Sequence, residues 1–151
     1  MNAMKDVLLR QDMPVAAIRR LLEDAQLPTA DVAPGMQQRF IGAQVDGDWL
    51  GVVAIEPLGE VALLRSLAVV AARRSQGLGR ALIGSAEALA QSLGVHVIYL
   101  LTTSATSFFA RLGYTSIARD NAPKAIRTTT QFVSLCPATA TLMRKEPTLH
   151  P

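Results

Sequence analysis

The chain has 151 residues, half of them apolar and 18% charged, and its formal net charge is +3. This length and composition predict a single globular domain, residues 1–151, with a sizeable core. The sequence has no long run of basic residues and few aromatic residues, which disfavours nucleic-acid binding. Its mild positive charge fits an anionic small ligand better. The longest nearly apolar stretch, 61–72, is interrupted by Arg65 and is too short to span a membrane.

The ends and the rare residues narrow the class of protein further. Residues 1–12 show no apolar segment ahead of a small-residue cleavage site, so we expect no secretory signal and a cytosolic protein. Cys136 is the single cysteine, which excludes an internal disulfide. His96 and His150 are isolated and lack metal-ligand spacing, so we expect no metal site. The oligomeric state stays open, with a homodimer as one option.

The first half of the chain predicts a helix followed by an antiparallel meander. A first strand is expected at 6–10. Asp12 is expected to cap a helix, with Pro14 in its first turn and apolar residues at helical spacing over 18–25. An Asp-Gly-Asp sequence separates the next two runs, as is typical of a hairpin. Three further strands are expected, at 39–45, 49–56 and 61–70.

The second half predicts a strand-helix-strand unit followed by shorter elements. Apolar residues recur at helical spacing over 77–93, and Gly94 is expected to end this helix. Ser104 is expected to cap a short helix over 104–113. Strands are expected on either side of that helix and near the end of the chain, at 95–103, 114–118 and 139–145, with an irregular segment at 119–138. The sequence therefore predicts an α+β domain with a mixed, mostly antiparallel sheet flanked by helices.

Residues 73–80, Arg-Arg-Ser-Gln-Gly-Leu-Gly-Arg, lie between an expected strand and an expected helix. Glycines at a helix start let the backbone approach a ligand, and the first N–H groups and the helix dipole favour an anion. Guanidinium groups bind phosphate through two parallel hydrogen bonds. The segment therefore predicts a diphosphate site. It has neither the Gly-Lys-Ser/Thr ending of a Walker loop nor the third glycine of a dinucleotide fingerprint.

The spacing Arg-x-x-Gly-x-Gly, from Arg74 to Gly79, resembles the acetyl-CoA-binding motif of the GNAT acyltransferase superfamily. The run 104–114 is similar to that family's later Ala-x-x-Phe-Tyr-x-x-x-Gly-Phe signature, and the order of elements agrees from about residue 5 to 145. The resemblance implies the GNAT fold, acetyl-CoA as cosubstrate and transfer of acetyl to an amine. The alternative for the loop alone is a surface turn with no ligand.

Three segments together resemble more narrowly the arsenic-resistance-associated N-acetyltransferase group. These are 63–69, 99–114 and, most distinctively, 122–145. The resemblance implies an acetyltransferase found with arsenic-detoxification functions, and it does not name the acceptor. We do not expect direct arsenite chelation, because Cys136 is one thiol where two or three must converge; this cysteine is expected to be a small buried apolar group.

The same resemblance assigns roles to residues of the cofactor site. The family's fourth strand pairs with the pantetheine arm, and the backbone N–H of Leu67 would lie near the thioester oxygen and act catalytically as an oxyanion donor. Thr102 takes the place of a common family asparagine, and Phe108 belongs to the second motif. The expected cofactor-binding residues are Leu67, Ala68, Val69, Arg74, Ser75, Gln76, Gly77, Leu78, Gly79, Arg80, Thr102 and Phe108.

The general acid and base are not assigned. The family tyrosine that often protonates the thiolate falls at Phe109, and the glutamate that serves some members as base falls at Leu63. Other candidates, each with a structural or surface alternative, are Glu56, Glu60, Tyr99 and Tyr114. These departures leave a second function open, a catalytically weak acyl-CoA-binding sensor.

Arg65 stands in the middle of the expected strand 61–70. Strand alternation places it on one face with Leu63, Leu67 and Val69, the face that looks toward the acceptor in the family. Its guanidinium is therefore expected to bind a carboxylate of the acceptor, with Arg127 as a second clamp or an exposed residue. The alternative is a buried ion pair of Arg65 with Glu56 or Glu60.

Overall fold

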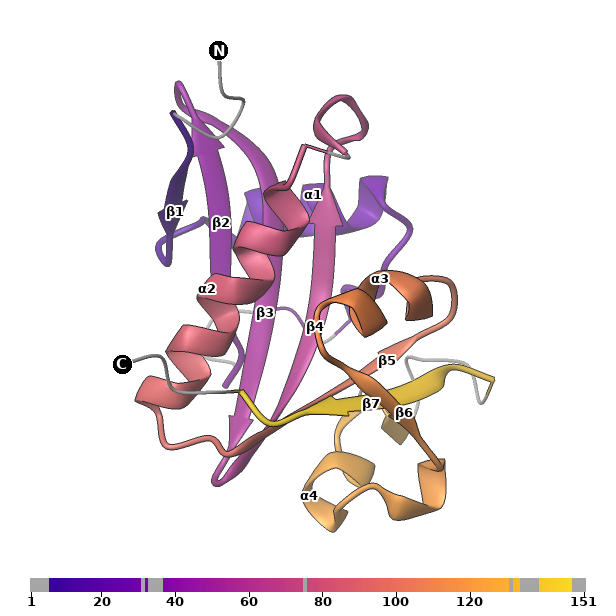
Figure 1. The fold of residues 1–151 in the computed structure, drawn as a ribbon. Coiled ribbons are helices and arrows are strands. Elements are labelled where there is room, and N and C mark those ends of the chain that lie inside the picture. The colour runs from indigo at the N-terminus through magenta and orange to yellow at the C-terminus, as the bar shows by residue number, and fades with distance from the viewer. Residues whose placement is uncertain are drawn as a thin grey trace. The chain divides into compact units, whose positions relative to one another are not determined.

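The computed structural model describes residues 6–30, 32, 37–74, 76–130, 132–133 and 139–147 (Figure 1). Its seven strands form one sheet in the order β1-β2-β3-β4-β5-β7-β6. The elements are β1 (Leu8–Arg10), α1 (Val15–Asp24), β2 (Arg39–Val45), β3 (Asp48–Leu58), β4 (Val61–Val69), η1 (Ala71–Arg73), α2 (Leu78–Ser92), β5 (Val97–Thr102), α3 (Thr106–Arg111), β6 (Thr115–Ile117), η2 (Arg119–Asn121), α4 (Lys124–Arg127) and β7 (Thr141–Lys145).

The sheet is mixed, as the sequence predicts. Strands β4 and β5 are parallel, whereas β1–β2, β2–β3, β5–β7 and β6–β7 are antiparallel. This confirms the α+β class with a mostly antiparallel sheet and helices beside it. None of the helices in the described part of the chain is both long and apolar enough to cross a membrane.

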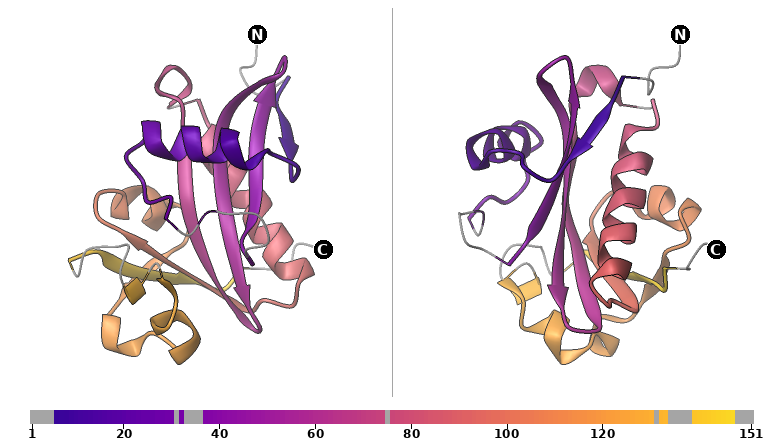
Figure 2. Two further views of the ribbon diagram at one scale, coloured as in Figure 1. Left: turned by 180° about the vertical axis from the view of Figure 1, so that it is seen from behind. Right: turned by 90° about the vertical axis from the view of Figure 1, so that its left-hand side faces the viewer.

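The chain groups into two compact units, one made of Met1–Ile55 and Ser66–Glu87 and the other of Glu56–Arg65 and Ala88–Pro151. In the first unit, helices lie on both faces of the strands (Figure 2). On one face α1 packs in an apolar cluster with Val52 of β3 and Ala68 of β4. On the other face Gly51 makes room for α2, because a Cβ built there would lie 2.9 Å from Leu82. Burial on both faces explains why β3 is apolar without a break from 51 to 55.

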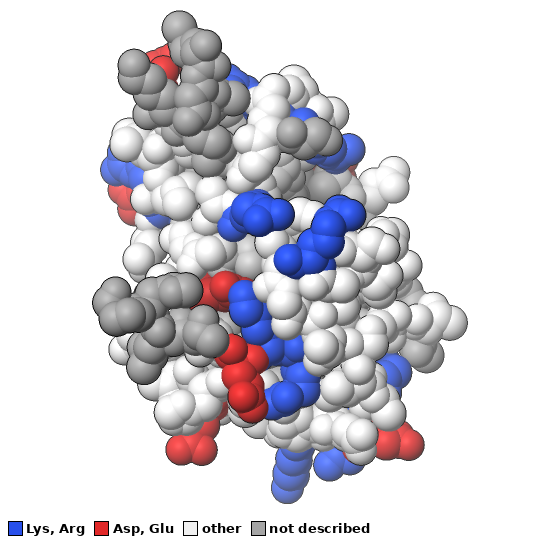
Figure 3. All heavy atoms as spheres, in the orientation of Figure 1, with Lys and Arg blue, Asp and Glu red and all other residues white. Residues whose placement is uncertain are grey.

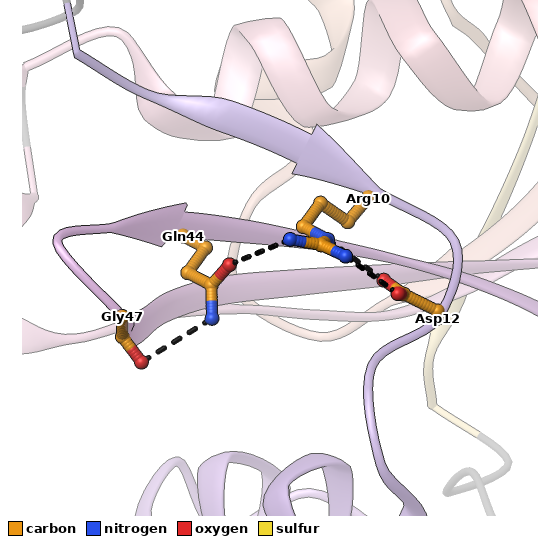
Figure 4. A network of polar contacts seen from close by, with 4 residues as sticks. All are labelled: Arg10, Asp12, Gln44 and Gly47. Carbon is orange, nitrogen blue, oxygen red and sulfur yellow. Dashed lines mark hydrogen bonds and ion pairs between the residues drawn. The ribbon is translucent and has the colours of Figure 1, made fainter.

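The start of α1 differs from the prediction. Pro14 takes the N-cap position, with no side-chain cap, so the expected capping role of Asp12 is wrong. The two carboxylate oxygens of Asp12 instead accept hydrogen bonds from Nε and Nη2 of Arg10, at 2.9 and 2.7 Å (Figure 4). Gln44 accepts a further bond from Arg10 and donates to the carbonyl of Gly47. The Arg10 guanidinium holds the pKa of Asp12 below its usual value.

The second unit is built around the parallel pair of β4 and β5. Leu63 faces Tyr99 in the register of this pair, and both pack in an apolar cluster with Leu142 of β7. Ala122 and Ile126 complete the cluster. The segment expected to be irregular therefore contains the short helices η2 and α4 and contributes to the core.

Two basic side chains, Arg119 and Lys145, bind backbone carbonyls in the second unit. Arg119 donates a hydrogen bond to the carbonyl of Ala140 at 3.1 Å, and its guanidinium lies 4.5 Å from the ring centre of Phe132. Lys145 donates to the carbonyl of Leu112 at 2.7 Å, just after α3. A positive group at a helix C-terminus is favoured by the helix dipole. These contacts hold the segment after β6 and the end of α3 to β7.

Candidate functional site

An irregularity interrupts β4 at Ser66. The backbone of Ser66 has φ +61°, in the left-handed region that non-glycine residues rarely adopt. The regular alternation expected over 63–70 is therefore wrong beyond Arg65, because a left-handed residue turns the chain out of the pleat. Such a conformation costs about 1–2 kcal/mol and persists where its surroundings impose it, often at functional sites. Leu67, the expected oxyanion donor, directly follows this irregularity, and so its N–H direction depends on it.

The loop after β4 is anchored at both of its ends. The N–H of Val70 donates to Leu50 of β3 at 2.9 Å. Arg74 is exposed, yet its Nε donates to the carbonyl of Val69 at 3.1 Å, so its guanidinium is held at the end of β4. At the other end, the carbonyl of Gly77 accepts from Ala81 in the first turn of α2. These hydrogen bonds hold the two ends of the loop, at the end of β4 and at the start of α2.

The start of α2 has the features of an anion site. Gly77 has φ +84°, and a Cβ built on it would meet no atom within 4 Å, so open space lies beside the backbone. The first N–H groups of a helix have no acceptor within the helix. The first turn of α2 carries no acidic residue. Gln76 and Arg80 are exposed here, whereas Leu78 is buried and fixes the helix; Ser75 lies outside the described residues.

The predicted cofactor-binding residues of the first unit are neighbours along the chain. Leu67, Ala68 and Val69 form the end of β4, and the loop to Arg80 follows directly. Thr102 and Phe108 belong to the second unit. On the face drawn in Figure 3, basic side chains lie near acidic ones, with uncharged side chains around them.

Thr102 ends β5 and its side chain prepares the start of α3. Its Oγ1 accepts the N–H of Ala105 at 3.0 Å. Ala105 is the N-cap residue and no side chain caps the helix, so the predicted capping role of Ser104 is wrong: the hydroxyl two positions earlier already takes the N–H at the helix start. The Thr102 hydroxyl keeps its own hydrogen for donation to a ligand. Phe108 is half-buried, with its ring 5.2 Å from that of Phe109.

We predict that Thr102→Val lowers stability by about 1 kcal/mol, because the valine keeps the shape but removes the acceptor of the Ala105 N–H. It should also weaken acetyl-CoA binding several-fold if the hydroxyl donates to the cosubstrate. Thermal melts and titration calorimetry measure the two effects. Thr102→Ser retains the hydroxyl and is the matched control. A valine variant that melts and binds like the parent would contradict both roles.

The positions expected for an acid and a base hold apolar, buried side chains. Leu63 is fully buried in its cluster, and the buried ring of Phe109 lies edge-on to Tyr114 at 5.7 Å. Tyr99 and Tyr114 are buried as well, which agrees with their structural alternative, and Glu60 is exposed in the β3–β4 turn.

Tyr99 makes a specific contact on β7. Nη2 of Arg144 donates to Oε1 of Glu146 at 3.0 Å, and hydrogen bonding to Glu146 and then to Tyr99 raises the pKa of the guanidinium. The phenol of Tyr99 therefore has a structural partner opposite it in the sheet register.

Arg65 forms the ion pair that the sequence offered as an alternative. Its Nη1 lies 3.6 Å from Oε1 of Glu56, and its side chain is 1% exposed, against 16% for Glu56. The structure thus selects Glu56 over Glu60 as partner, while the carboxylate-clamp role of Arg65 stays a prediction. Arg127 is exposed at the end of α4.

Among the described residues, no three or more His, Cys, Asp or Glu side chains lie close enough together to hold a metal ion. His96 is exposed, and Cys136 and His150 lie outside these ranges.

The comparisons with known proteins agree on one family. The model of the acetyltransferase (GNAT) family matches residues 8–114. An uncharacterized N-acetyltransferase of Chlorobaculum tepidum is 36% identical over 88 residues, and the match spans 58% of this chain and only 56% of that protein.

Two solved structures show the same fold. The N-acetylglutamate synthase of Neisseria gonorrhoeae, complexed with coenzyme A and N-acetyl-glutamate, has a TM-score of 0.78 at 19% identity, covering 95% of this chain and 35% of that chain. A GNAT-family acetyltransferase from Staphylococcus aureus Mu50 has a TM-score of 0.77 at 13% identity, covering 94% and 99% of the two chains.

Proposed function

Because the chain belongs to the acetyltransferase (GNAT) family, we propose that it transfers acetyl from acetyl-CoA to the amine of a small, carboxylate-bearing acceptor. The observation that carries this proposal is the start of α2, where left-handed Gly77 leaves open space beside the backbone and Arg74 is held on Val69. A diphosphate fits this arrangement of N–H groups and guanidinium. We propose one acetyltransferase domain over residues 1–151, working in the cytosol; both statements rest on the sequence alone.

In the proposed reaction the acceptor nitrogen bonds to the acetyl carbon, the carbon–sulfur bond breaks, and the sulfur leaves with the electron pair. The chain's part is to bind and to polarise. The loop to Arg80 holds the diphosphate, the backbone of 67–69 holds the arm, and the N–H of Leu67 donates to the thioester oxygen. The amine's proton goes to water, and the thiolate is a tolerable leaving group because a thiol has a pKa of about 8.5.

Two observations support the proposal that the acceptor carries a carboxylate. Arg127 presents an exposed guanidinium in the second unit, and the Neisseria complex shows that a protein of this fold can hold N-acetyl-glutamate together with coenzyme A. We further propose arsenic detoxification as the setting, with an organoarsenical amino-acid analogue as acceptor. This part rests on the likeness of segment 122–145 to the arsenic-resistance-associated group.

One observation favours a second function. The positions where relatives carry a tyrosine acid or a glutamate base hold Phe109 and Leu63, both buried among apolar side chains. A protein that binds acyl-CoA without turnover, a sensor, would need neither group. Transfer by positioning and backbone polarisation alone remains our first choice, because a small amine and a thioester need little proton catalysis.

A thiol-release assay separates the two functions. Acetyl-CoA is incubated with pairs of amines that differ in the carboxylate alone, such as an amino acid and its decarboxylated amine. We expect amine-dependent release of coenzyme A and a higher kcat/KM for the carboxylate member of each pair. Binding of acetyl-CoA without amine-dependent release would establish the sensor. Absence of binding, measured by a melting shift, would overturn both.

A further inference from the structure

The outer edge of the sheet exposes two consecutive leucines. Strand β1 is first in the strand order and pairs on one side with β2. Leu8 is 58% exposed and Leu9 is 40% exposed, so both faces of this strand present apolar surface. Natural proteins usually protect an edge strand by placing charges or proline along it. Strand β1 spans Leu8–Arg10 and ends on the charged Arg10, and the charged Asp6 lies two residues before the strand, in a turn.

The charges at the two ends are self-complementary. When a strand pairs antiparallel with its own copy about Leu8, residue 7 lies opposite residue 9, and Asp6 lies opposite Arg10 of the copy. Two-fold symmetry makes this attraction twice, and Leu8 meets its own counterpart. A register centred on Leu9 would instead set Asp6 opposite Asp12 of the copy, which is repulsive. The sequence thus favours the register about Leu8.

The side chains of this edge can make the new contacts. Asp6 is exposed, and the side chain of Arg10 is 45% exposed although it already binds Asp12 and Gln44. A guanidinium has five N–H donors, and these two partners use three of them. The Arg10 group can therefore bind a second carboxylate without releasing the first.

We propose that β1 is a self-association edge, through which two copies of the chain pair antiparallel about Leu8 into a symmetric dimer. The open N–H and C=O groups of each edge pair with the other, and the exposed leucines are covered. Pairing about Leu8 also requires residues 6 and 7, which precede β1, to extend the strand. A ladder of about five residues is small, so the dimer should be weak and depend on concentration. This inference is independent of the proposed acetyl transfer.

The experiment exchanges charges between chains. Asp6→Lys and Arg10→Glu are prepared separately and studied by sedimentation velocity over a concentration series, alone and mixed in equal amounts. Each variant alone sets like charges opposite each other at both symmetric positions, and its dissociation constant should rise about tenfold or more. In the mixed dimer the introduced lysine of one chain lies opposite the introduced glutamate of the other, and the unchanged Arg10 lies opposite the unchanged Asp6. The mixture should therefore dimerise like the parent.

Two controls make the result specific. Asp24→Lys and Arg20→Glu make the same charge changes at exposed positions of α1 and should leave the dimer unchanged. In the mixture, the Arg10→Glu chain still lacks its contact with Asp12. Restored dimerisation therefore shows that the single variants lost affinity through the contacts between chains and not through this contact within one chain. A parent that stays monomeric at every concentration, single variants that dimerise like the parent, or a mixture that stays monomeric would each overturn the proposal.

Discussion

Gly77→Asp should weaken acetyl-CoA binding by about 2–4 kcal/mol, or roughly 30- to 1000-fold in Kd. The structure offers two reasons. Gly77 has φ +84°, which a side chain disfavours, and the space beside it is open, so a carboxylate there would meet the ligand and not the protein. A negative charge at the start of α2 would then repel the diphosphate that this backbone is proposed to bind. Titration calorimetry measures the loss.

Two matched variants separate charge from strain. Gly77→Asn has nearly the same shape without the charge, and asparagine tolerates positive φ better than most residues, so it should lose much less affinity. Gly59→Asp makes the same change at another glycine with φ +78° and open surroundings, but the nine residues of β4 separate it from the loop. It should bind like the parent. Equal affinity of Gly77→Asp and the parent would contradict the diphosphate assignment.

Local patterns in the sequence were sufficient to predict the position of the loop between β4 and α2 and much of the fold. Glycine is the residue that permits positive φ, and Gly47, Gly77 and Gly94 all adopt it where a turn, a loop and a helix end were expected. The hairpin after β2 and the parallel strands β4 and β5 also follow from short-range signals. The capping residues were less predictable. Ser104 was expected to cap α3, but no side chain caps this helix, and the hydroxyl of Thr102 accepts the N–H of the N-cap residue Ala105.

Other features depend on contacts that no local pattern encodes. Serine has no preference for positive φ, so the irregularity at Ser66 had no signal in the sequence, although it breaks the alternation that placed Leu67 on the same face as Arg65. The core role of Ile126 was also hidden, because α4 has four residues and too few for a periodic pattern. Arg65 could be assigned two roles from the sequence, and in the structure it forms an ion pair with Glu56 of the neighbouring strand.

Arg65→Ala should lower the free energy of unfolding by about 3–5 kcal/mol, because it leaves the Glu56 carboxylate without its guanidinium in a poorly solvated place. The Arg65 side chain is 1% exposed and lies 3.6 Å from that carboxylate. For a chain of this length the melting temperature should fall by roughly 6–20 °C. Arg65→Lys should recover part of the loss, and combining Arg65→Met with Glu56→Gln should recover more, because it removes both charges together.

The same variants test the clamp. If Arg65 binds an acceptor carboxylate instead, Arg65→Ala should melt near the parent and lose about 2–4 kcal/mol in kcat/KM for that acceptor, with acetyl-CoA affinity kept. Lysine should then rescue little, since an ammonium cannot make the two parallel bonds. In the ion-pair role, the kinetic loss should follow the unfolded fraction and disappear at temperatures where the variant is folded. Melts and kinetics on the same preparations decide between the roles, and a variant unchanged in both would exclude the ion pair and the clamp alike.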